Sequence, residues 1–260
     1  VVVAVVIVAF CHRSSAVFSR NTSTPIGTND LQGQVIRAST EFSTIYEYDP
    51  HTDGSHNGRF AIECFTNWKY LSVSVMASHS LGDDIKTFYI CPNTIMTVNV
   101  PIEIPSDDFK FGCGFGPNSG PGKNCIITGG WAHFKIIGSS KNVVFRDLAF
   151  TESRIASIVA AGEKDASVEF INCAWSSNDG KAAILIYNEA KGVPVTENVK
   201  IPDLVESRER SMAVRCDGCI FAKNQQHEDG TILSLGGEIS FERTLFVGNV
   251  VNVGLIYSKY

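Results

Sequence analysis

Carboxylate and arginine side chains recur at matching positions of one repeated segment, and side chains of these types can transfer protons and bind ions. Asp217 and Glu242 occupy equivalent positions in two copies of the segment, and Arg215 lies two residues before Asp217. A carboxylic acid can protonate a glycosidic oxygen, a base can remove a sugar proton, and carboxylates can bind calcium. Asp217, Glu242 and Arg215 are therefore the candidates for catalysis.

Three further charged residues, Glu169, Arg146 and Arg243, are candidates for binding a ligand. Because side chains alternate along a strand, Glu169 is expected beside Arg215 on an outward face, and Asp217 beside Glu242, with Arg243 one residue further on. Charges of both signs also keep an exposed sheet soluble, and an ion pair between Glu169 and Arg215 is the simplest structural interpretation. Catalysis, ligand binding and a solvated surface all stay open for these residues.

These residues come together only if the segments that carry them stack on one another. Ser167–Asn178 (SVEFINCAWSSN) recurs with the same spacing of apolar positions in Asn142–Ser153, Ala213–Asn224 and Glu238–Asn249. The steps between copies are 25, 46 and 25 residues, and the long step contains a 21-residue insertion, expected as a loop at about 190–210. A fixed register that is interrupted once is typical of a structural unit stacked on copies of itself.

Each copy is followed by a second short apolar run, and such runs bounded by Gly, Asn, Asp and Ser predict strands. Strands that recur every 25 residues and stack directly run parallel, so we expect an all-β solenoid wound around one apolar axis. The two inward columns expected are Phe145, Phe170, Cys216 and Phe241, and Phe150, Trp175, Phe221 and Phe246. A polar ladder at a bend is expected from a third column, Ser153, Asn178, Asn224 and Asn249.

The segments NVVFRDLAF and VEFINCAW resemble the coil strands of the right-handed parallel β-helix of the pectin-lyase-like superfamily. The resemblance covers roughly Phe88 to the C-terminus. It implies a right-handed parallel β-helix (solenoid) over 88–260, preceded by an N-terminal entry and cap region over 17–87. Within that region, Phe60–Met76 mixes alternation with aromatic residues and predicts strands. The chain stops at Tyr260 directly after a strand, so further coils or a capping partner are expected there.

This resemblance is more specific for fold than for activity. The Asn-Thr-Asp, Asp-Asp, Gly-His-Gly and Arg-x-Lys series of polygalacturonases is absent, and EFINCAW lacks the His of the Trp-x-Asp-His strand of pectate lyases. We therefore expect a protein that binds a polysaccharide or cell-surface glycan, or serves as a structural module, without catalysis or a cofactor. A polysaccharide lyase or glycoside hydrolase acting on an acidic polysaccharide is the alternative, and calcium is expected only for the lyase.

Composition and charge narrow the class of partner. The chain has 260 residues, of which 44% are hydrophobic and 19% charged, and this composition favours a packed core. A net charge of −5 without a basic stripe gives no reason to expect nucleic acid as a partner. Val1–Phe10 is an apolar run followed by Ser14 and Ala16, which predicts a signal peptide over 1–16 and a secreted or cell-surface protein. A membrane anchor whose start is missing and a buried strand are the alternatives for this run.

The eight cysteines agree with an oxidising compartment and at least two disulfides. Cys113 and Cys125 bracket a loop rich in Gly, Pro and Asn and form the first expected pair, which closes a loop whose cross-link stabilises by about 3 kcal/mol. Cys64 and Cys91 form the second expected pair.

The remaining cysteines of the coils share one region. Cys173 and Cys219 are expected in the same column of successive coils, either as inward thiols or as one more disulfide. Cys216 and Cys219 form a C-x-x-C pair, but a zinc site needs two further ligands and His227 is the only nearby candidate. We therefore predict no metal site.

Overall fold

The computed structural model describes residues 64–80, 86–105, 107–116, 124–163, 165–178, 180, 182–187, 196, 198, 212–226, 231–251 and 256–258. Within these residues the chain consists of short β-strands and one α-helix, α2 (Trp68–Ser80). The predicted signal peptide, most of the entry region, most of the insertion at 190–210, His227 and Tyr260 lie outside the described residues.

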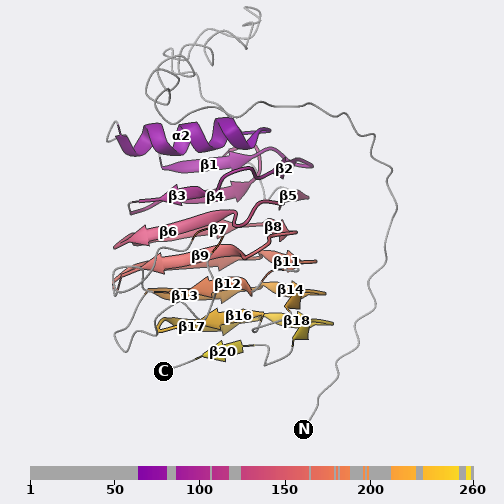
Figure 1. Cartoon of the computed structure of the whole chain (residues 1–260). Helices are drawn as coiled ribbons and strands as arrows, with labels where there is room; N and C mark the ends of the chain where they lie inside the picture. The colour runs from indigo at the N-terminus through magenta and orange to yellow at the C-terminus, as the bar shows by residue number, and fades with distance from the viewer. Residues whose placement is uncertain are drawn as a thin grey trace, which may run out of the picture.

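The described strands form three six-stranded parallel sheets, to each of which every coil gives one strand (Figure 1). Sheet A consists of β1 (Thr87–Ile90), β4 (Lys110–Cys113), β7 (Val143–Arg146), β10 (Ser167–Ile171), β13 (Ala213–Asp217) and β17 (Glu238–Glu242). Sheet B consists of β2 (Ile95–Thr97), β5 (Cys125–Thr128), β8 (Leu148–Thr151), β11 (Ala174–Ser176), β14 (Ile220–Ala222) and β18 (Leu245–Val247). Sheet C consists of β3 (Ile102–Ile104), β6 (Phe134–Gly138), β9 (Ala156–Gly162), β12 (Ala182–Ile186), β16 (Ile232–Ser234) and β20 (Ile256–Ser258). Two short strands, β15 (Gln225–Gln226) and β19 (Val250–Val251), form a fourth, two-stranded sheet.

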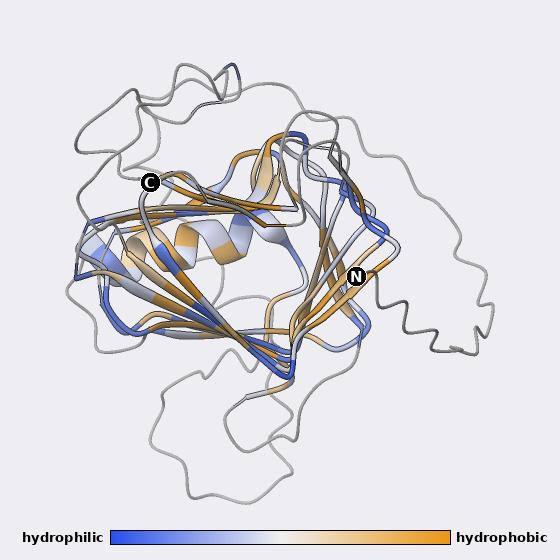
Figure 2. Ribbon diagram, turned by 90° about the horizontal axis from the view of Figure 1, so that it is seen from below, coloured by the Kyte–Doolittle hydropathy of each residue, from blue (hydrophilic) through white to orange (hydrophobic). Residues whose placement is uncertain are grey.

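The predicted inward columns are confirmed by the strand register. Phe170 pairs with Phe145 in the coil before it and with Cys216 in the coil after it, and Cys216 pairs with Phe241. The Phe145 and Phe170 rings stack with their centroids 5.2 Å apart, which matches the separation of neighbouring strands of about 4.8 Å. The second column repeats this arrangement in β8, β11, β14 and β18. Figure 2, seen along the stack, shows the strands of successive coils superposed around a common interior.

The predicted polar ladder is also confirmed, with Ser153, Asn178 and Asn224 buried and Asn249 half-buried. The Asn178 side-chain oxygen accepts hydrogen bonds from the Ser153 backbone N–H and from the hydroxyls of Ser153 and Ser157. Asn224 accepts from both the backbone N–H and the side-chain amide of Asn178, and Asn249 accepts in the same way from Asn224. Each side chain therefore satisfies the polar groups of the coil before it, at the bend between sheets B and C.

Helix α2 corrects the expectation of strands over Phe60–Met76 from Trp68 onward, whereas residues 60–63 lie outside the described residues. Asn67 begins the helix, because its side-chain oxygen accepts from the Lys69 N–H at 2.9 Å. Trp68, Leu71 and Val75 are spaced to lie on one helical face, and that face is buried. The alternation of polar and apolar residues in this segment predicts a strand, but the segment forms a helix. In the described part of the chain, no helix is long and apolar enough to cross a membrane.

The helix packs on the first coils of the stack (Figure 1). The Trp68 ring meets the Phe134 ring edge-on at 5.3 Å, and its indole N–H donates to the Val100 carbonyl at 2.8 Å. Figure 2 shows α2 lying across the end of the stack. The helix therefore covers the end of the first described coil.

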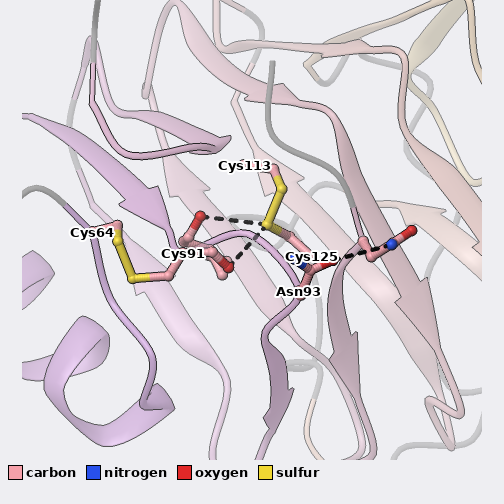
Figure 3. Close-up of a disulfide and its surroundings, with 7 residues drawn as sticks. Cys64, Cys91, Asn93, Cys113 and Cys125 are labelled. Carbon is pink, nitrogen blue, oxygen red and sulfur yellow. Dashed lines mark hydrogen bonds between the residues drawn. A yellow bond between two sulfur atoms is a disulfide. The ribbon is translucent and has the colours of Figure 1, made fainter. Parts of the chain in front are cut away.

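Both expected disulfides are present and lie close together (Figure 3). Cys64–Cys91 joins the segment before α2 to the end of β1, and Cys113–Cys125 joins the end of β4 to the start of β5. The Cys125 sulfur lies 3.4 Å from the Cys91 carbonyl oxygen, so the two bridges brace the same corner of the first two coils. Two disulfides indicate an oxidising environment.

A third disulfide between Cys173 and Cys219 is not formed, and this alternative was wrong. Both residues are buried free thiols, as is Cys216. The Cys173 thiol lies 3.5 Å from the Phe145 carbonyl oxygen, and the Cys219 thiol lies 3.4 Å from that of Phe170, so each is directed to the main chain of the preceding coil. Burial raises the pKa of the Cys173 thiol above its usual range and disfavours the thiolate that disulfide exchange requires.

We predict that Asn224→Leu lowers the free energy of unfolding by about 2–4 kcal/mol, because it removes the acceptor of the buried Asn178 backbone and side-chain N–H groups and one donor to the Asn249 side-chain oxygen. Chemical denaturation monitored by circular dichroism measures the change. The matched control is Asn99→Leu, which places the same substitution on an exposed residue and should cost less than about 0.5 kcal/mol. Equal effects at the two positions would show that the ladder does not stabilise the stack.

A buried histidine predicts how stability depends on pH. His133 is fully buried, its ring stacks on Phe150 at 5.8 Å, and neither ring nitrogen makes a well-formed hydrogen bond. Burial lowers the pKa of His133 from 6.5 to about 3, and nearby main-chain groups of Gly129 and Thr151 offset only part of this shift. Between pH 6.5 and 3 the unfolded chain therefore binds a proton that the folded chain does not.

We accordingly expect this residue to make the free energy of unfolding fall by about 1.4 kcal/mol for each pH unit below 6.5. Denaturation curves over this pH range should show a shallower loss for His133→Leu than for the wild type. His79→Gln is the control, because the His79 side chain is exposed on α2. An unchanged slope in His133→Leu would contradict the assignment of the acid sensitivity to this residue.

Candidate functional site

The outward face of sheet A carries two columns of side chains that cross all six strands. The first column contains Thr87, Lys110, Val144, Glu169, Arg215 and Ser240. The second contains Tyr89, Gly112, Arg146, Ile171, Asp217 and Glu242. The predicted neighbours Glu169 and Arg215, and Asp217 and Glu242, are therefore confirmed as register partners.

Sheet A is the charged face of the stack. The described outward residues of sheet B are Ile95, Thr97, Ile126, Thr128, Ala149, Thr151, Ala174, Ser176, Ile220, Ala222, Leu245 and Val247, none of which is charged. Sheet C is buried on both faces over β9 and β12. Their nearly continuous apolar sequences agree with strands that are covered on two sides. Most of the charged side chains of the described strands therefore lie on sheet A, apart from the Glu103–Lys135 pair of sheet C.

A groove of about 530 Å³ runs over β1, β4, β7 and β10 on the outer face of sheet A. The lining side chains with polar or aromatic groups include Tyr89, Lys110, Arg146, Asp147, Glu169 and Asn172. Two of the residues expected to bind a ligand, Arg146 and Glu169, thus lie in this groove. The third, Arg243, and the expected catalytic residues Arg215, Asp217 and Glu242 do not line it.

Tyr89 lies at the end of the groove nearest α2, and a glycine makes room for its ring. A Cβ atom added to Gly112, the register partner of Tyr89, would lie 3.4 Å from two carbons of the ring. The ring therefore extends over the glycine, and the Tyr89 side chain is half-buried. A half-buried aromatic ring with one accessible face is a surface on which the apolar face of a sugar can pack.

Lys110 and Arg146 place two positive charges in the middle of the groove. Both side chains are exposed, and among the described residues no carboxylate lies within 4.0 Å of either. Their charges are therefore available to an anionic group of a ligand, for which guanidinium and ammonium groups are the usual protein donors.

The expected catalytic residues form ion pairs instead. Arg215 lies 3.6 Å from Glu169 and 2.9 Å from Glu242, so one guanidinium bridges two carboxylates. The other expected catalytic carboxylate, Asp217, accepts three hydrogen bonds from Arg243 at 2.6–2.9 Å. These bonds raise the pKa of the Arg243 guanidinium, which stays charged. The interpretation of Glu169 and Arg215 as a cross-coil ion pair is confirmed.

In four successive coils the corner between sheets A and B begins with a residue in the left-handed backbone conformation. Asp147, Asn172, Gly218 and Arg243 occupy this position with φ between 49° and 65°. The Asn172 side-chain amide donates to the Asp147 carboxylate at 3.2 Å, and this bond holds both residues at the rim of the groove. Asn, Asp and Gly are the residues that adopt this conformation most readily.

Tyr89, Lys110 and Asn172 line the groove but were not among the candidates that the sequence predicted. The first two lie in TFYI and KFGC, which lack the full repeated segment, so only the alternation of each short run could have placed them beside Arg146. In the described part of the chain, no three His, Cys, Asp or Glu side chains gather as metal ligands.

Comparison of the chain with protein-family models, with curated proteins and with solved structures found no match.

The corner next to the groove yields a prediction about stability. A Cβ atom at Gly218 would lie 2.5 Å from the Asn172 side-chain oxygen, whereas one at Gly248 meets nothing closer than 3.9 Å, although both glycines have positive φ. Gly218→Ala should therefore lower the free energy of unfolding by about 1–3 kcal/mol more than Gly248→Ala. Paired denaturation curves measure the difference, and equal losses would mean that Asn172 moves aside without cost.

Proposed function

We propose that this chain is a secreted or cell-surface glycan-binding protein with a right-handed parallel β-helix of the pectin-lyase-like kind. Its groove on sheet A holds a segment of an anionic polysaccharide without cleaving it. The observation that carries the proposal is the groove itself, in which an aromatic ring and two cations without carboxylate partners lie along successive coils.

Three features support the architectural part of the proposal. Parallel strands joined by crossovers in one sheet are right-handed in about 98% of cases, which favours a right-handed coil. The buried face of α2, with Trp68, Leu71 and Val75, supports a cap that protects the end of the stack. The two disulfides support a secreted or extracellular location.

The chemistry of the groove supports binding of an anionic glycan. Tyr89 offers an aromatic surface at one end, and Lys110 and Arg146 follow it on the next two coils. Asp147, Glu169 and Asn172 add acceptors and one amide donor near the opposite end, which suit sugar hydroxyls. A mainly neutral protein surface would leave the two cations of the groove unused.

The ion pairs of Asp217 and Glu242 favour binding over turnover. A general acid or base must be within reach of the substrate, whereas these two carboxylates are each paired with an arginine beyond the groove. The alternative of a lyase or hydrolase requires the ligand to displace Arg215 or Arg243, and the same experiment can detect it.

The test is calorimetric titration of the full chain with acidic hexasaccharides and with a neutral hexasaccharide. We expect binding of acidic chains only, weakened about tenfold in Arg146→Ala through loss of one charge-assisted contact. The matched control, Lys69→Ala, removes one exposed positive charge on α2 and should bind like the wild type.

Each mixture should also be assayed for unsaturated products and new reducing ends, with and without calcium. We expect none. If products form and Asp217→Asn abolishes their formation, the protein is an enzyme and the proposal of binding without catalysis is wrong. Failure of every acidic hexasaccharide to bind would overturn the proposed function.

A further inference from the structure

The charges that line the groove change sign along the stack. The first coil contributes the neutral Tyr89, and the second and third contribute Lys110 and Arg146. The fourth contributes Glu169, which lies in the same column as Lys110 and two coils away, at about 10 Å. A ligand that lies along the groove therefore meets an aromatic ring, then two cations, then a carboxylate.

Arg215 does not cancel the negative end of the groove. It pairs with Glu169 at 3.6 Å and with Glu242 at 2.9 Å, so two carboxylates share one guanidinium and the group keeps a net charge of −1. The shorter contact belongs to Glu242, which lies on the far side of Arg215 from the groove. Asp217 and Arg243 compensate each other and add nothing to this end. Asp147, at the rim on the same coil as Arg146, adds a further negative charge beside the coil of Glu169.

From this order of charges we infer that the preferred ligand is a polysaccharide in which anionic and neutral sugars alternate, rather than one that carries a carboxylate on every sugar. This inference rests on the proposed function of the groove and specifies its ligand. An alternating chain places its carboxylate against Lys110 and Arg146 and presents a neutral sugar, with hydroxyl donors, to Glu169.

A uniformly anionic chain cannot avoid the carboxylate end. When its charged groups meet Lys110 and Arg146, the following sugar brings another carboxylate to Glu169 and Asp147, where like charges repel. Glu169 is only partly exposed, with 34% of its side-chain surface accessible, so water screens this repulsion incompletely. General attraction to the two cations alone would instead favour the chain with more negative charges.

The test compares two hexasaccharides of equal length by calorimetry at one ionic strength with the full chain. One alternates glucuronate and N-acetylglucosamine, and the other is hexagalacturonate. We expect the alternating chain to bind about tenfold tighter, although it carries half the charge. Glu169→Gln should raise the affinity for hexagalacturonate about tenfold and weaken that for the alternating chain, because a neutral amide accepts from sugar hydroxyls less strongly, so that the preference for the alternating chain is lost.

The matched control is Glu163→Gln, which removes one exposed negative charge outside the groove and should leave the ratio of affinities unchanged. Unaltered thermal unfolding of Glu169→Gln would show that the variant keeps its fold. Tighter or equal binding of hexagalacturonate by the wild type would overturn this inference while leaving the proposed function intact. Binding of neither hexasaccharide would count against the proposed function itself.

Discussion

In-register stacking of parallel strands is the constraint on which the rest of this structure depends. Since neighbouring strands are about 4.8 Å apart, equal side chains on successive coils stand in van der Waals contact along the whole stack. Phe145 on Phe170, and Trp175 on Phe221, use this spacing to bury flat rings with centroids 5.2 and 4.6 Å apart. The same spacing places Glu169 beside Arg215 on the outside. Core and surface columns are thus two consequences of one register.

The polar ladder makes this register unique. Apolar columns tolerate exchanges among residues of similar size, so they would not by themselves oppose a slip between coils. Asn178, Asn224 and Asn249 are buried or half-buried amides whose donors and acceptors are satisfied only by the coil directly before or after them. A slip would leave these groups unpaired in the interior, where an unmet hydrogen bond is costly. The ladder therefore adds specificity that the hydrophobic interior lacks.

The first coil is more constrained than the other described coils, and the three sheets differ in burial and charge. The first coil is covered by α2 and braced by two disulfides, so the groove begins on the most constrained part of the described chain (Figure 3). Sheet C is buried on both faces over β9 and β12 and the outward face of sheet B is uncharged, so most of the charged side chains of the described strands lie on sheet A. A binding face on rigid, paired strands needs little reordering when a ligand arrives, which reduces the entropic cost of binding.

The sequence by itself determined the repeat, the inward and outward columns, the asparagine ladder and both disulfide pairs, because each follows from the spacing of residues in a parallel stack. It did not determine the helix, since the buried face of α2 exists only against the end of a coil. It also could not decide which charges are free. Asp217 and Arg146 look alike as charged residues of one column, and only the fold brings Arg243 onto Asp217 while leaving Arg146 over a groove shared with Tyr89 and Lys110. Ion pairs and grooves are decided by residues distant in sequence, and their distances are set by tertiary structure alone.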